Sequence, residues 1–139
     1  MKNAVLLLIF TITFAGCQKK INFNEKTYEK KSQLSCTKNC ANIKISTIKA
    51  EGSSVLSDTI NKRLFKEITA ITHLQETPPT SKTYEELVND FIAYYENLKK
   101  EFPTDSFGWE AEIDATKIYE SQDIINISLD YYTFTGGAH

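Results

Sequence analysis

Histidine is scarce in this chain of 139 residues, which contains only His73 and His139. A catalytic zinc site takes three protein ligands, and two isolated histidines do not supply such a set. The chain also lacks a G-x-S-x-G turn, a phosphate-binding loop and a convincing cysteine nucleophile. The sequence therefore predicts no metal, no cofactor and no enzymatic activity.

A surplus of basic residues is missing too, because 16 lysines and arginines stand against 18 acidic residues and the net charge is −2. Nucleic acids select for proteins with a basic face, so no nucleic-acid partner is expected. Internal repeats and low-complexity tracts are absent as well. The length is enough for one compact domain.

Long apolar runs are confined to the amino terminus. Lys2 is followed by an apolar run over residues 4–14, which is too short to span a bilayer comfortably. The run leads into the tetrapeptide Phe14-Ala15-Gly16-Cys17, which resembles a bacterial lipobox because small residues stand directly before a cysteine. An uncleaved membrane anchor and an ordinary signal peptide are the alternatives.

We therefore expect residues 1–16 to be a lipoprotein signal peptide and Cys17 to carry lipid, palmitate included. Residues 17–26 are polar and lysine-rich, which predicts a solvated leash. Residues 27–139 would form one domain. The protein would be anchored in the cell envelope of a bacterium, facing the extracytoplasmic side of a membrane.

Two further cysteines, Cys36 and Cys40, have three residues between them. The compartment outside the cytoplasm is oxidising, so we predict a disulfide across a tight turn. A zinc site and a redox-active pair are the alternatives, but zinc lacks further ligands here and redox pairs favour a two-residue spacing.

Hydrophobic periodicity predicts strands over residues 27–34, 41–51, 109–119 and 124–134. Ile48 falls out of phase with Ile43 and Ile45, which indicates a bulge near Thr47. Two helices separate the middle strands. The resulting fold class is α+β, an antiparallel sheet of three or four strands packed by two helices in the order ββααββ.

The first helix is indicated by apolar residues three or four apart, with Ser54 or Ser57 as its cap and His73 near its end. The apolar positions are Leu56, Ile60, Leu64, Ile68 and Ile71. The second begins at a capping box, Thr83 to Glu86, and stops before Pro103. Its stripe consists of Tyr84, Leu87, Val88, Phe91, Tyr95, Leu98 and Phe102, with Tyr94 beside it as the better candidate for an exposed aromatic residue.

The third strand carries acidic and apolar side chains on opposite faces. The apolar face holds Trp109, Ala111, Ile113, Ala115 and, by extension, Tyr119. Glu110, Glu112 and Asp114 form an acidic row on the other face. This row is a candidate site for a cationic partner or calcium, and an ordinary solvated strand face is the alternative.

The last strand changes character along its length. Ile125, Ile127, Leu129 and Tyr131 alternate with polar residues and are expected to face the core. Tyr132 and Phe134 put aromatic rings on the formerly polar face. Because the helices already have one sheet face to cover, we predict that these two rings are exposed and available to a partner.

The final residues, Tyr131-Tyr132-Thr133-Phe134-Thr135-Gly136-Gly137-Ala138-His139, resemble the Y-x-Y-T-G-G-A-H signature of domain of unknown function 4163. This bacterial extracytoplasmic domain occurs in RsiV-type anti-sigma factors and PdaC-type peptidoglycan deacetylases. In such proteins a partner domain follows the signature, so we expect that this chain lacks one. The Asp and H-x-x-x-H ligands of polysaccharide deacetylases are absent, as is the cytoplasmic segment of RsiV-type proteins.

The resemblance implies an accessory rather than a catalytic part. We expect a lipid-anchored module that recognises a protein, such as a cationic lysozyme-like one, or a cell-wall glycan. The alternatives are the N-terminal part of a longer cell-wall enzyme or sensor whose active half is missing, and a truncated product without a role of its own.

Overall fold

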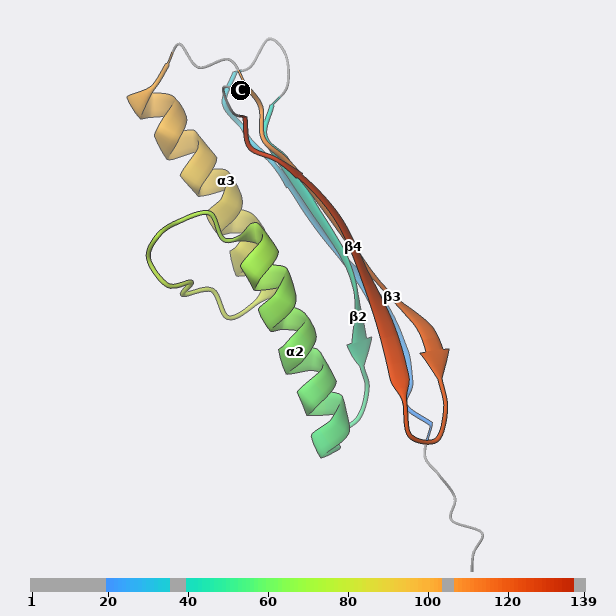
Figure 1. The fold of residues 1–139 in the computed structure, drawn as a ribbon. Helices are drawn as coiled ribbons and strands as arrows, with labels where there is room; N and C mark the ends of the chain where they lie inside the picture. Colours follow the sequence, from blue (N-terminus) through green and yellow to red (C-terminus); the bar gives the residue numbers. More distant parts are fainter. Residues whose placement is uncertain (1–19, 36–39, 104–106, 137–139) are drawn as a thin grey trace, which may run out of the picture.

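The chain forms a four-stranded sheet with both helices on one face (Figure 1). The computed structural model describes residues 20–35, 40–103 and 107–136. Its elements are β1 (Phe23–Lys31), β2 (Asn42–Ala50), α2 (Val55–Thr72), α3 (Tyr84–Glu101), β3 (Glu110–Glu120) and β4 (Ile125–Phe134). The predicted α+β class and the order ββααββ are confirmed. Neither described helix has the length and apolar character needed to cross a membrane.

The sheet is mixed, with the strand order β1-β2-β3-β4. The outer pairs are antiparallel, as predicted, but β2 and β3 run parallel, with Asn42 opposite Glu110 and Ser46 opposite Asp114. The parallel pair arises because the chain leaves β2, passes through both helices and returns to begin β3 beside the start of β2. Such a crossover connection is what parallel neighbours require.

Strand β1 begins at Phe23, earlier than the predicted Thr27, and ends at Lys31. Residues 23–26 of the predicted leash therefore belong to the sheet. The prediction missed them because β1 is an edge strand with few apolar side chains, so its alternation is weak. Phe23 and Tyr28 are its only apolar contributions to the core.

Both predicted helix starts are confirmed. Ser54 is the N-cap of α2, and its Oγ accepts a hydrogen bond from the backbone N–H of Ser57 at 3.0 Å. At α3 the Oγ1 of Thr83 accepts from the backbone N–H of Glu86 at 3.2 Å. The Glu86 carboxylate in turn accepts from the backbone N–H of Lys82, one residue before the cap. These bonds satisfy donors that the first helical turn leaves unpaired.

The core lies between the sheet and the helices, and an aromatic cluster closes one end of it. The indole of Trp109, which is 9% exposed, contacts the rings of Phe91, Tyr94 and Tyr95 with centroid distances of 5.8, 5.6 and 5.6 Å. Tyr94 was expected to be exposed, but this contact leaves it half-buried. The other fully buried aliphatic side chains include Ile43, Ile45, Ile68, Ile92 and Ile113.

The irregularity in the sheet lies in β3 and not in β2. Thr47 and Ile48 are both buried, but the register between β1 and β2 runs without a shift through this point, so the bulge predicted near Thr47 is absent from that pair. A shift occurs instead between Lys117 and Tyr119 in the β3–β4 pair. It moves Tyr119 off the apolar face of β3, where it was expected, and leaves it exposed.

The helices pack mainly against β1 and β2. The helix-side face of β4 is therefore only partly covered: Ile127 and Leu129 are half-buried, and Tyr131 is 61% exposed. The prediction that Tyr131 belongs to the core is wrong, because the helical layer does not extend over that part of β4.

Candidate functional site

The structure brings the five predicted binding residues together on the sheet face that points away from the helices. In the β3–β4 register, Glu110 lies opposite Phe134 and Glu112 lies opposite Tyr132. The next outward-facing pair consists of Asp114 and Asp130. We refer to these six residues as the outer-face site.

Both aromatic rings of the outer-face site are accessible. Tyr132 is 56% exposed and Phe134 is 40% exposed, so the prediction that they are uncovered is confirmed. Glu110 and Glu112 are exposed beside them. The site therefore presents carboxylates and aromatic faces side by side, the two kinds of group that attract Lys and Arg side chains.

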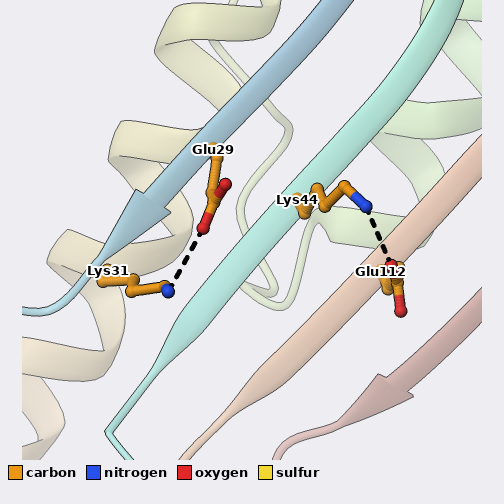
Figure 2. A network of polar contacts seen from close by, with 4 residues as sticks. All are labelled: Glu29, Lys31, Lys44 and Glu112. Atoms are coloured by element: carbon orange, nitrogen blue, oxygen red, sulfur yellow. Dashed lines mark hydrogen bonds and ion pairs between the residues drawn. The ribbon is translucent and has the colours of Figure 1, made fainter.

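Lys44 of β2 partly neutralises the acidic row. Its Nζ lies 3.2 Å from the Oε1 of Glu112, and on the same face Lys31 lies 3.3 Å from Glu29 (Figure 2). The hydrogen bond to Glu112 raises the pKa of Lys44 above its usual value. Exposed pairs of this kind contribute little to stability and exchange readily for other partners.

In the described part of the chain, Asp114 and Asp130 have no cation within ion-pair distance, although the charge of Asp114 acts on Lys44. Within residues 20–35, 40–103 and 107–136 neither carboxylate forms an ion pair, and Asp130 accepts a hydrogen bond only from the Oγ of Ser128 at 3.0 Å. Like charges directly opposite each other across two strands repel. This pair is therefore a local cost to the free protein that a bound cationic group would relieve.

Asp130→Asn is expected to stabilise the free protein by about 0.2–1 kcal/mol, because it removes this repulsion while an amide oxygen still accepts from Ser128. Urea unfolding followed by circular dichroism measures the change. Glu67→Gln, an exposed substitution of the same charge on α2, should leave the midpoint nearly unchanged. A midpoint that falls in the Asp130 variant would contradict the idea.

Sequence reasoning missed two members of this surface, Asp130 and Lys44. The alternation of the last strand does indicate that Asp130 lies on the polar face. Its position opposite Asp114, however, depends on the register shift after Lys117. Lys44 reaches Glu112 only because β2 and β3 are neighbours.

The other predicted site residues are not brought together by the described part of the chain. Cys17, Cys36 and His139 lie outside it, so lipidation and the Cys36–Cys40 disulfide stay predictions. His73 caps the end of α2 as predicted, and its ring bonds the backbone carbonyl of Thr77. Across the described ranges no three His, Cys, Asp or Glu side chains are grouped so as to hold a metal ion.

An α+β domain of this topology is found in two solved proteins of the domain of unknown function 3298 family. One, from Pseudomonas aeruginosa, has a TM-score of 0.52 and 23% identity over 87% of this chain. The other, from Bacteroides fragilis, has a TM-score of 0.51 and 13% identity over 86% of this chain. At these identities the likeness concerns the fold. This chain spans about half the length of each, 47% and 51% respectively.

The chain belongs to the family described as deacetylase PdaC, whose family model matches residues 34–139. The resemblance identified at the Tyr131 to His139 signature is thus confirmed. The match begins after β1, which precedes it in the chain. No curated protein matches the sequence.

Proposed function

We propose that this chain is a lipid-anchored, non-catalytic module of the bacterial envelope that binds a cationic protein through the outer-face site. The observation that carries the proposal is the cross-strand register that places Glu110, Glu112 and Asp114 beside Tyr132, Phe134 and Asp130. Scattered acidic residues are ordinary on a solvated sheet, but an acidic row lined by exposed aromatic rings is not.

The chemistry of the site favours a protein with clustered Lys or Arg side chains. The carboxylates supply charge-assisted hydrogen bonds, and Tyr132 and Phe134 supply apolar area and cation–π contacts. A lysozyme is a suitable first partner because it is cationic and acts on the cell wall, where an envelope module would meet it. The aromatic rings alone would also suit a cell-wall glycan, which makes a glycan the second candidate.

The proposal assigns no catalytic step to this chain, in keeping with its two isolated histidines. The alternative is that the chain acts as the N-terminal part of a longer cell-wall enzyme or sensor. Its match to about half of each related structure is the observation that favours this alternative.

The test compares lysozyme binding by the wild-type protein and by the triple variant Glu110→Gln, Glu112→Gln, Asp114→Asn in titration calorimetry. Three exposed charge contacts of about 0.5 kcal/mol each predict a loss of roughly tenfold in affinity. Raising the ionic strength from about 0.01 M to about 0.15 M should weaken the wild-type complex, since screening then acts within about 8 Å.

A matched control separates the site from general charge. Glu67→Gln, Glu76→Gln and Glu101→Gln together remove the same formal charge from exposed positions outside the sheet. This control should bind lysozyme within about twofold of the wild type, because long-range attraction alone changes affinity little at moderate salt. Equal binding by both triple variants would exclude the outer-face site.

A further inference from the structure

One end of the domain carries a concentration of exposed apolar side chains that the outer-face site does not use. They lie in the first turn of α2 and near the tip of the β3–β4 hairpin, and are between 53% and 84% exposed. This apolar end consists of Val55, Leu56, Ile118, Tyr119 and Ile124. Figure 1 shows the start of α2 and the hairpin turn at the same end of the molecule, opposite the end where β4 finishes.

The local backbone explains why these side chains are exposed together. The register shift between Lys117 and Tyr119 inserts Ile118 as an extra residue, so that two consecutive residues of β3 are both uncovered. The turn that follows is tight, with the backbone N–H of Ser121 bonded to the carbonyl of Ile124 at 2.8 Å. Ile124 is held at the tip by this turn.

The same end is where the described chain begins. Lys20 and Ile21 line a groove of about 570 Å³ together with Leu56, Ile60 and Ile124. The backbone N–H of Ile21 donates to the Oε1 of Glu120 at 3.3 Å, which fixes the start of the chain against the hairpin. Cys17 precedes Lys20 by three residues, and three residues span at most about 10 Å.

From this geometry we infer that the apolar end of the domain docks onto the surface of the bilayer that holds the lipid of Cys17. The inference rests on the lipid anchor of the proposed function. A tether this short keeps Lys20, which lines the groove beside Leu56 and Ile124, within about 10 Å of the residue that carries the lipid. Apolar side chains and a tyrosine that reach about 5–10 Å into the interfacial region would then be buried without any conformational change.

The charges around the groove indicate that apolar contacts dominate the docking. Lys20 and Arg63 are balanced by Glu120 and Asp123. Glu120 is also paired with Lys117 at 2.7 Å, and this hydrogen bond lowers the pKa of its carboxyl below the usual value. We therefore expect docking on zwitterionic membranes and little dependence on salt, in contrast to the outer-face site.

The test uses a protein of residues 17–139 with Cys36→Ala and Cys40→Ala, so that only Cys17 couples to a maleimide lipid in phosphatidylcholine vesicles with brominated acyl chains. Tyr119→Trp places an indole at the apolar end, and its emission should fall by about half or more relative to vesicles without bromine. The control is the same lipid-coupled protein without Tyr119→Trp. Its single tryptophan, Trp109, is buried at the other end of β3, so its emission should not be quenched.

A second variant shows which residues are responsible. In the Tyr119→Trp background, Leu56→Ser, Ile118→Ser and Ile124→Ser together should abolish the quenching, whereas Phe102→Ser, an exposed apolar position beyond α3, should not. Absence of quenching, or quenching that survives the triple variant, overturns the inference. Vesicle-independent dimerisation through this end would also overturn it. Because coupling is chemical, failure of natural lipidation does not affect the result.

Discussion

Trp109→Ala is expected to lower the free energy of unfolding by about 3–5 kcal/mol, which is a large part of the stability of a domain this size. The indole contacts three aromatic rings of α3, and a close-packed interior relaxes only partly around the cavity that its removal leaves. Urea unfolding monitored by far-ultraviolet circular dichroism measures the change, since the substitution removes the only tryptophan.

Two variants bracket this result. Trp109→Phe keeps an aromatic ring in the cluster and should lose less than half as much stability. Phe102→Ala, which is exposed near the same end of α3, should change the midpoint by no more than about 0.5 kcal/mol. A loss below about 1 kcal/mol for Trp109→Ala would show that the cluster does not hold α3 to the sheet.

Cys17→Ala should release the protein from membranes into the soluble fraction, because it removes the thiol that we propose carries the lipid. Fractionation of cells followed by immunoblotting gives the distribution. Labelling with a fatty-acid analogue should give a signal in the wild type and none in the variant. The effect should be nearly complete, since apolar surface contacts alone bind membranes weakly and reversibly.

The control for this result is Cys36→Ala with Cys40→Ala, which removes the other two cysteines and should leave membrane association and labelling intact. A wild-type protein that takes up no label would refute lipidation. Release of the double variant as well would indicate that misfolding, and not the loss of lipid, governs the distribution.

Much of the fold could be read from local patterns. The alternation from Ile125 to Leu129, the capping bonds at Ser54 and Thr83, and the apolar stripe of α3 all depend on neighbours in sequence, and each is found in the structure. The parallel pairing of β2 with β3 could not be read, because the side-chain period of a strand is the same for both directions. The first four residues of β1 were missed, because this edge strand buries few side chains.

The outer-face site was predictable in composition but not in arrangement. Strand alternation placed Glu110, Glu112, Tyr132 and Phe134 on the face away from the core, but did not show which of them lie opposite one another. The pairing depends on the β3–β4 register, which the extra residue Ile118 shifts by one position. The role of Asp130 follows from the register alone.

The parallel contact between β2 and β3 also determines when the protein can fold. Each outer pair joins strands close in sequence, but Lys44 and Glu112 at the central seam are 68 residues apart. Closing so long a loop is slow. During synthesis from the amino terminus, the chain therefore cannot close its sheet until β3 has been made. During that interval the edge of β2 that later pairs with β3 is unpaired. Because β2 carries the apolar residues Ile43 and Ile45, it can then aggregate with other chains.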